Sequence, residues 1–240
     1  MGPAEEILQE GIRIPVVRIV RGGQVDREML NLILLNECTS QERKREGDLD
    51  AQIGACRVGE RRILEVAEKY GERRLHALID ELLDYFERLV RAELRKMPAG
   101  EFSAENWLDD DDVTDVPRKI AVRLELNPGV SSIHVDFASS SPQVAGSVNA
   151  VRAITLSACF YVMRCLLQED APATAGVLRP LSLNAPAGSI VEARPPAAVA
   201  GNVETSPCIV GVLLRAVGQG HSRRIPVTSA GTVSNLTLGR

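Results

Sequence analysis

The sequence predicts a mixed α+β fold that combines a helical hairpin, antiparallel β-hairpin elements and a central buried helix. Apolar residues recur at spacings of three and four through residues 48–97, which is the period of amphipathic helices. Apolar and polar residues then alternate through 119–126 and 131–137, as in half-buried strands. A run that starts at about Ser147 is apolar on nearly every side, which is typical of a helix at the centre of a domain. We therefore expect a helical part at about 25–98 and a mixed strand and helix part at about 100–240.

The N-terminal quarter predicts a strand followed by a short helix. Residues Ile12–Val20 alternate loosely, and the glycines Gly22 and Gly23 that follow predict a turn. Asp26 is expected to cap a short helix whose apolar stripe contains Met29, Leu30, Ile33 and Leu34.

Two long helices are expected next. Asp48 is the expected cap of the first helix, Gly71 interrupts the pattern, and Pro98 and Gly100 end the second helix. Helices joined by so short a break are expected to pack as a hairpin with a buried apolar seam. Glu60 lies on that seam, and a buried carboxylate must be paired or neutral. Pairing with a nearby arginine is the favoured interpretation, and a catalytic role for Glu60 is the alternative.

The following segment predicts a small sheet. Phe102–Leu108 is a candidate strand, and the turn sequence Asn127-Pro128-Gly129 predicts that 119–126 and 131–137 form a hairpin. The Asp109–Asp112 run lacks the spacing and the closing glutamate of a calcium-binding loop. We therefore expect it to be a solvated connection.

Asp136 stands where the second strand of this hairpin ends. In the strand, Ile133, Val135 and Phe137 share one side, and a turn of small residues, Ala138–Pro142, separates it from the central helix. A carboxylate in such a strand–turn–helix junction is a plausible group to bind a polar ligand. The alternative, which spacing alone favours, is that Asp136 closes the turn by accepting backbone N–H groups.

The C-terminal part is rich in proline and contains short apolar runs such as Leu181–Leu183. Thr205 or Ser206 is expected to cap a helix that continues to about Val217. Cys208 would then lie in the first turn, where the helix dipole lowers a thiol pKa. No histidine is near it in sequence, so a buried structural thiol is the favoured interpretation.

Composition excludes several classes of function. The net charge of −4 and an aromatic content of 3% argue against binding to nucleic acid or to an anionic membrane. Five scattered cysteines without a CxxC pair indicate neither a zinc site nor a disulfide framework, and they favour a cytoplasmic protein with reduced thiols. Arg152 and Arg164 in the apolar helix argue against a membrane span.

Six stretches together resemble one family, the hydantoinase B/5-oxoprolinase family, which also includes related subunits of acetone-type carboxylases. In chain order they are EILQEGIRIP, DLDAQIGACRVGERRILEVAEKYG, VDFASSSPQVAGSVN, RPLSLNAPAGS, PPAAVAGNVETS and GTVSNLTLG. The resemblance covers nearly all 240 residues and implies the central section of a B-type subunit, as a fragment, a truncated gene or a split gene. Its motif positions make Glu60, Asp136, Asn202 and Glu204 the candidate catalytic residues.

The resemblance also implies a partner and a reaction. An A-type subunit would supply the ATP site of a hetero-oligomer that opens a cyclic amide such as 5-oxoproline or a hydantoin. The family's divalent-metal ligands lie upstream of the EILQEG-like stretch, and His76, His134 and His221 match none of them, so no metal or cofactor site is expected in this chain. The chain alone is therefore expected to be inactive. Two alternatives are a non-catalytic truncated paralogue with an interaction role and a fragment of an ATP-dependent ketone carboxylase subunit.

Overall fold

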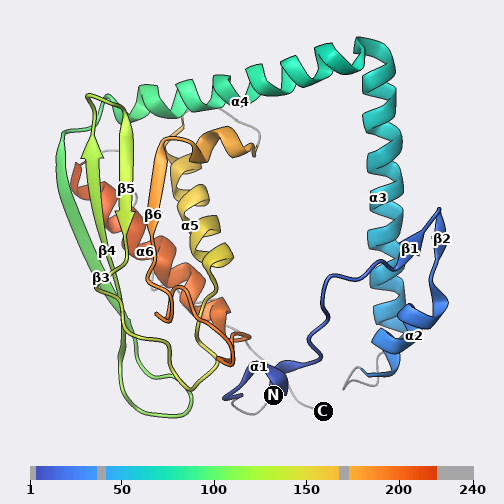
Figure 1. Cartoon of the computed structure of the whole chain (residues 1–240). Helices are drawn as coiled ribbons and strands as arrows, with labels where there is room; N and C mark the ends of the chain where they lie inside the picture. Colours follow the sequence, from blue (N-terminus) through green and yellow to red (C-terminus); the bar gives the residue numbers. More distant parts are fainter. Residues whose placement is uncertain (1–3, 37–41, 168–172, 221–240) are drawn as a thin grey trace. The chain divides into compact units, whose positions relative to one another are not determined.

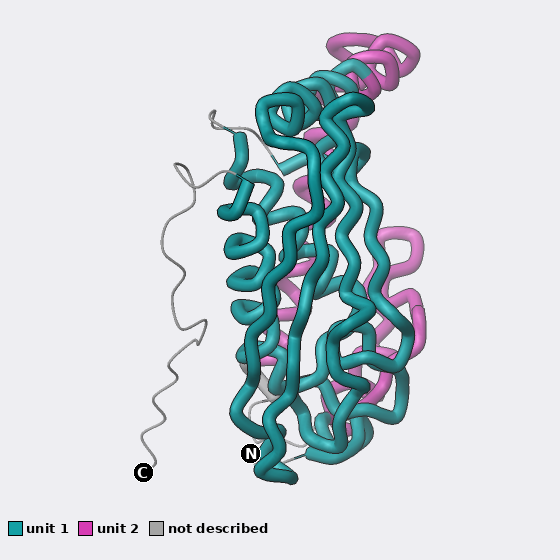
Figure 2. Tube along the Cα trace, turned by 90° about the vertical axis from the view of Figure 1, so that its left-hand side faces the viewer, with its two compact units in different colours: residues 1–10, 81–240 teal, residues 11–80 magenta. Residues whose placement is uncertain are grey.

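The computed structural model describes residues 4–36, 42–167 and 173–220. Within it the chain divides into two compact units, residues 11–80 and residues 1–10 together with 81–240 (Figure 2). Cys38, His221 and the GTVSNLTLG stretch lie outside the described residues. The predicted α+β class is confirmed, since long helices accompany a four-stranded mixed sheet and a small hairpin (Figure 1).

The unit of residues 11–80 holds a small hairpin and a helix pair. Strands β1 (Val20–Arg21) and β2 (Gln24–Val25) pair antiparallel around Gly22 and Gly23, whose φ angles are 56° and 81°. The predicted turn is confirmed, but the strand is shorter than predicted, because Ile12–Ile19 has no strand pairing. Helix α2 (Arg27–Leu35) begins at the predicted cap, where Asp26 Oδ1 accepts the Met29 N–H at 3.1 Å.

Helices α3 (Glu42–Tyr70) and α4 (Glu72–Leu94) are separated at Gly71, as predicted, by a residue with a φ of 78°. The predicted cap at Asp48 is wrong, because α3 already includes Glu42. The predicted burial of a shared seam is also wrong. Within the unit of residues 11–80, Ile63 of α3 is 64% exposed and Ile79 of α4 is 46% exposed, and the apolar stripe of α4 is buried in the other unit, at Phe86, Val90 and Leu94.

The main sheet has the strand order β3-β4-β5-β6. Strands β3 (Gly100–Leu108), β4 (Arg118–Asn127) and β5 (Ser132–Asp136) pair antiparallel, which confirms the predicted strand and hairpin. The fourth strand, β6 (Leu181–Asn184), runs parallel to β5 and places Asn184 beside Asp136. The sequence shows a short apolar run at Leu181–Leu183, but no strand was predicted there.

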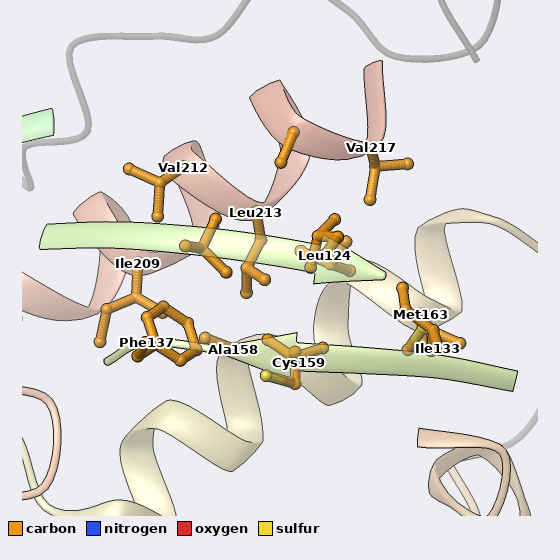
Figure 3. Packing of buried hydrophobic residues seen from close by; sticks show 14 of the residues in the cluster. Leu124, Ile133, Phe137, Ala158, Cys159, Met163, Ile209, Val212, Leu213 and Val217 are labelled. Carbon is orange, nitrogen blue, oxygen red and sulfur yellow. The ribbon is translucent and has the colours of Figure 1, made fainter. Parts of the chain in front are cut away.

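Helices α5 (Arg152–Cys165) and α6 (Asn202–Gly220) pack on one face of this sheet and against each other (Figure 1). In Figure 3, Leu124, Ile133 and Phe137 lie on the sheet side of the core. They face Cys159 and Met163 of α5 and Leu213 of α6. The central helix begins at Arg152 and not at about Ser147, and it is buried on one side only, since Tyr161 is 56% exposed. Two short elements, α1 (Ile7–Glu10) and the 3-10 turn η1 (Ala175–Leu178), complete the unit.

No helix among the described residues is both long enough and apolar enough to cross a membrane.

Candidate functional site

Asp136 ends β5 and is held by three donors. Its Oδ1 accepts the backbone N–H of Ala138 at 2.9 Å and the side-chain amide of Asn184 at 2.8 Å. Its Oδ2 lies 3.3 Å from Nη2 of Arg123, the residue directly across the β4–β5 ladder. The contact with Ala138 is the turn-closing bond that the sequence predicted.

These donors determine the charge state of Asp136. Burial alone would raise the pKa of this carboxyl, but the Ala138 N–H, the Asn184 amide and the Arg123 guanidinium hold the pKa below its usual value. The carboxylate is therefore an engaged acceptor, whereas a general acid or base needs a proton within reach and a pKa near the working pH. The geometry favours the structural interpretation of Asp136.

The turn after Asp136 extends the sheet with side chains. Ser140 Oγ accepts the Ala121 N–H at 3.1 Å and donates to the Ala121 carbonyl at 3.0 Å. Ser141 Oγ accepts the Lys119 N–H at 2.9 Å, and the Ser141 N–H donates to the Lys119 carbonyl at 2.9 Å. These two hydroxyls take the place of a strand partner for β4 beyond the end of β5.

Asn149 joins two separate backbone segments just before α5. It is fully buried, its Oδ1 accepts the Val144 N–H at 2.8 Å, and its amide donates to the carbonyls of Val144, Gly146 and Ala198 at 2.8–2.9 Å. Because each buried polar atom of this side chain is paired, Asn149 fixes the loop 144–149 against the segment that precedes α6.

The loop after β6 packs against the same turn. Gln143 donates its backbone N–H to the Gly188 carbonyl at 2.8 Å, and its Oε1 accepts the Arg194 N–H at 2.8 Å. Glu192, whose side chain is 7% exposed, accepts a hydrogen bond from Arg152 at 2.6 Å and one from Arg194 at 2.9 Å. Each oxygen of the buried Glu192 carboxylate therefore accepts a hydrogen bond from an arginine, which offsets the cost of burying its charge.

Helices α1 and α6 complete this end of the unit. Glu10 Oε1 accepts the N–H groups of Val199 and Ala200 at 2.7 and 2.6 Å. The Gly201 N–H donates to the Ser147 carbonyl at 2.9 Å, and the buried Thr205 hydroxyl donates to the Val148 carbonyl. Thr205 is therefore not a helix cap. Helix α6 begins earlier, at Asn202, which corrects the predicted start.

Four of the six stretches singled out in the sequence thus meet through hydrogen bonds: EILQEGIRIP, VDFASSSPQVAGSVN, RPLSLNAPAGS and PPAAVAGNVETS. Glu10, Asn149, Gln143 and Gly201 provide the links described above. We call this assembly the motif junction, consisting of residues 6–10, 136–150 and 184–205. The stretch 48–71 belongs to the other unit.

The other candidate residues have varied surroundings. Asn202 opens α6 and donates its amide to the Val199 carbonyl at 2.6 Å, and Glu204 lies half-buried in the same first turn. Glu60, predicted to be buried on a seam, is exposed on α3. The arginines near Glu60 in the sequence have other acceptors. Arg61 and Arg62 approach Glu65, and Arg57 donates to the Gly23 carbonyl.

The structure also tests the predictions for the Asp109–Asp112 run and for Cys208. Asp111 is fully buried and accepts Arg118 Nη2 at 2.7 Å and the Thr114 N–H at 2.6 Å, so the predicted solvated connection is wrong at this residue. Cys208 is 2% exposed, which confirms the predicted buried thiol, and burial raises the pKa of this thiol. Cys208 lies beyond the first turn of α6.

Several residues of the junction were missed from sequence. Glu10, Asn149, Asn184 and Glu192 each bond to segments far away in the chain, and only Asn149 carried a local signal, as a polar residue inside an otherwise small and apolar run. His134 shares the half-buried strand face with Asp136, and its Nδ1 lies 2.7 Å from Ser182 Oγ. The part of the chain that the structure describes has no group of three or more His, Cys, Asp or Glu side chains placed to hold a metal ion.

Comparison with known proteins gives consistent matches. The family model described as Hydantoinase B/oxoprolinase matches residues 1–240. An uncharacterised protein of Methanocaldococcus jannaschii is 32% identical over 98% of this chain and 40% of its own length. The caprolactamase subunit beta of Pseudomonas jessenii is 33% identical over 81% of this chain and 33% of its own.

Solved structures agree with these matches. The ATP-dependent caprolactamase from Pseudomonas jessenii superposes with a TM-score of 0.82 at 30% identity, over 93% of this chain and 38% of that one. A nucleotide-free acetone carboxylase gives a TM-score of 0.83 at 13% identity, over 96% of this chain and 32% of that one, which shows a shared fold. The chain therefore spans well under half the length of the relatives it matches.

Proposed function

The chain belongs to the hydantoinase B/oxoprolinase family, and we propose that it forms part of a B-type subunit that, with an A-type subunit, opens a cyclic amide by ATP-dependent hydrolysis. The observation that carries this proposal is the match of the family model to residues 1–240. The relatives named as a caprolactamase subunit and an ATP-dependent caprolactamase support the substrate class, since caprolactam is a cyclic amide. We extend this class to 5-oxoproline and hydantoins.

The motif junction supports a division of labour between the subunits. Three of its carboxylates are already engaged: Asp136 with Arg123 and Asn184, Glu192 with two arginines, and Glu10 with two backbone N–H groups. Such bonds hold loops in place and leave no free acid or base at these residues. We assign to this chain the positioning of loops and to the rest of the assembly the chemical groups.

The family's nucleotide and metal fit this division. ATP activates the amide for hydrolysis, and we place its site in the A-type subunit. The donor set of the described residues does not fit a divalent metal, because it contains no group of three or more potential ligands. We therefore derive no step of the reaction through a metal in this chain, and we propose that the isolated chain is inactive.

A second candidate function is a non-catalytic subunit that keeps the family fold and an interaction role. The same engaged carboxylates favour it, because none of them needs a substrate to satisfy its hydrogen bonds. The likeness to acetone carboxylase concerns the fold alone, so a ketone carboxylase role is the weaker alternative.

The test is reconstitution of the full-length B-type subunit that contains this chain with the A-type subunit encoded by the same organism. The two purified proteins, separately and mixed, receive ATP with 5-oxoproline, a hydantoin or caprolactam, and ADP and the ring-opened product are both quantified. We expect both to form in equal amounts only in the mixture and only with a cyclic amide. A stable complex without either product would establish the non-catalytic alternative, and absence of both complex and product would contradict the proposal.

A further inference from the structure

Helix α4 fixes the point at which strand β5 begins. Arg91 donates to the carbonyls of Val130 and Ser131 at 3.1 and 2.9 Å. Arg95 donates from Nε to the Ser131 hydroxyl at 2.8 Å. Ser131 has a φ of 55°, which residues other than glycine seldom adopt, and it directly precedes β5. The two arginines therefore hold the turn from which β5 starts.

The same helix fixes the start of β6. Arg179 lies just before β6, and its Nη1 donates to Asp84 and, at 3.2 Å, to Glu87. Glu87 also accepts a hydrogen bond from Arg91 at 2.8 Å, so one network of ion pairs reaches the starts of both strands. We call Asp84, Glu87, Arg91 and Arg95 the α4 anchor. All of these residues belong to the unit that contains the main sheet.

The 3-10 turn η1, which directly precedes Arg179, packs on the backbone of α4. Gly176 is buried there, and a Cβ at this position would lie 2.2 Å from the carbonyl oxygen of Leu83, so only glycine permits this close approach. Pro180 follows Arg179, and its carbonyl accepts the Ile133 N–H of β5 at 3.0 Å. The segment 175–180 is therefore held between α4 and β5 before β6 begins.

The register of β6 is only partly determined by its own sequence. Within the described sheet, β6 has four residues and pairs with β5 alone. Leu181 and Leu183 pack against the core, but this alternation has a period of two residues. A slip of β6 by two residues would keep the apolar side inward and would place Ser182, in place of Asn184, beside Asp136. Alternation therefore does not distinguish these two registers.

We propose that the α4 anchor selects the register of β6, and that Arg179 is thereby a positioning residue for the contact between Asn184 and Asp136. A slip of two residues displaces a parallel strand by about 6.6 Å, which would separate Arg179 from both of its carboxylate partners. The ion pairs of Arg179 are partly exposed and individually weak, so they act together with the Gly176 contact. The proposal concerns the fold of this chain, so it and the enzymatic function can fail independently.

The pKa of Asp136 reports whether Asn184 is in place. Burial raises this pKa, but the Ala138 N–H, the Asn184 amide and Arg123 hold it below its usual value. Strand β6 itself carries no charged residue. The other titratable or charged side chains on the same face of β3, β4 and β5 near Asp136 are Glu101, Arg123, Glu125 and His134. None of them belongs to the α4 anchor, so variants of the anchor leave these groups unchanged.

Titration of Asp136 by NMR in the whole chain tests the proposal with two variants of opposite charge. Arg179→Gln removes a cation, and Asp84→Asn combined with Glu87→Gln removes two anions, yet both break the same ion pairs. We expect both to raise the pKa of Asp136 by at least about half of the rise that Asn184→Ala causes. A through-space effect of charge would instead raise this pKa in the first variant and lower it in the second. That result, or an unchanged pKa in both variants, would overturn the proposal.

Amide hydrogen exchange separates a local change at β6 from a general loss of stability. The Phe137 N–H donates to the Asn184 carbonyl at 2.9 Å, so Arg179→Gln should speed its exchange at least about tenfold. The Val122 N–H in the β3–β4 ladder should exchange at the wild-type rate. Arg88→Gln is the matched control, because it removes the same charge from α4 one turn after Asp84 and should change neither amide. Equal acceleration of both amides in Arg179→Gln, or the same effect from Arg88→Gln, would overturn the proposal.

Discussion

Asp136 and Asn184 lie side by side at the ends of the parallel strands β5 and β6, and the Asn184 amide donates to Asp136 Oδ1 at 2.8 Å. The bond joins residues 48 positions apart in the chain. It connects the end of the hairpin predicted from sequence to a strand that was not predicted, and it therefore anchors the motif junction to the sheet.

Removal of this amide should destabilise the junction measurably. Asn184→Ala deletes one donor to a charged acceptor while the Ala138 N–H and Arg123 remain, so we expect a loss of about 1–2 kcal/mol in the free energy of unfolding. Ser182→Ala on the same strand is the control, because the bond between Ser182 and His134 involves no carboxylate, so the loss should stay within about 0.5 kcal/mol. Equal losses for the two variants in urea titrations would contradict a special role for Asn184.

Stability should fall on acidification through Asp111 and Asp136. Burial would raise the pKa of each carboxyl, but hydrogen bonds from Thr114 and Arg118 to Asp111, and from Ala138 and Asn184 to Asp136, lower both below their usual value. A carboxyl with a lowered folded-state pKa stabilises the fold above its unfolded pKa of about 3.9, and it loses this contribution as pH falls through the folded value. Asp111→Asn should therefore be less stable than wild type at neutral pH and show a shallower decline between about pH 5 and about pH 2. Parallel pH curves for the two proteins would show that Asp111 does not contribute.

Gly146 should not tolerate a side chain. A Cβ at this position would lie 1.6 Å from the backbone oxygen of Asp111, so Gly146→Ala must displace the buried Asp111 loop. We expect a loss of more than about 3 kcal/mol or an insoluble protein. Gly54→Ala within α3 is the control, since nothing lies within 4 Å of its added Cβ, and alanine should stabilise the helix by up to about 1 kcal/mol. Equal melting temperatures for the two variants would contradict the close packing at Gly146.

The two halves of α4 should respond differently to a charge. Val90 is buried in the hydrophobic core of the unit that contains the main sheet. Val90→Asp should therefore lower the free energy of unfolding by more than about 4 kcal/mol or prevent folding. Leu82→Asp lies on the exposed part of the same stripe and should change the free energy of unfolding by less than about 1 kcal/mol. Thermal melts monitored by circular dichroism distinguish the two, and unfolding of Leu82→Asp would show that this residue is covered.

Local patterns predicted the elements that depend on neighbouring residues. The Asp26 cap, the Gly71 break, strands β3 to β5 and the inward side of Ile133, Val135 and Phe137 all follow from spacing or turn chemistry. Strand β6 was missed because a four-residue run is recognised as a strand only beside β5, its partner about 50 residues earlier in the chain.

The errors have a similar cause. Thr205 looked like a helix cap, but its hydroxyl bonds the Val148 carbonyl across the junction, and the start of α5 moved to Arg152 because Asn149 holds the preceding loop in a non-helical path. Amphipathic spacing predicted a buried seam on α3 and α4, yet spacing alone does not say whether the covering surface belongs to the same chain. Asp136, recognised from sequence, is placed by Asn184 and Arg123, which no local pattern connected to it.

The most direct test of the account measures stability and turnover of Asp136→Asn together, the latter in the complex with the A-type subunit. Asparagine keeps the shape and removes the charged acceptor, so we predict a loss of about 1–3 kcal/mol in the free energy of unfolding. We also predict that kcat for lactam-dependent ADP formation stays within about tenfold of wild type. A fall in kcat of about a thousandfold with unchanged stability would contradict the account and place Asp136 in the chemistry.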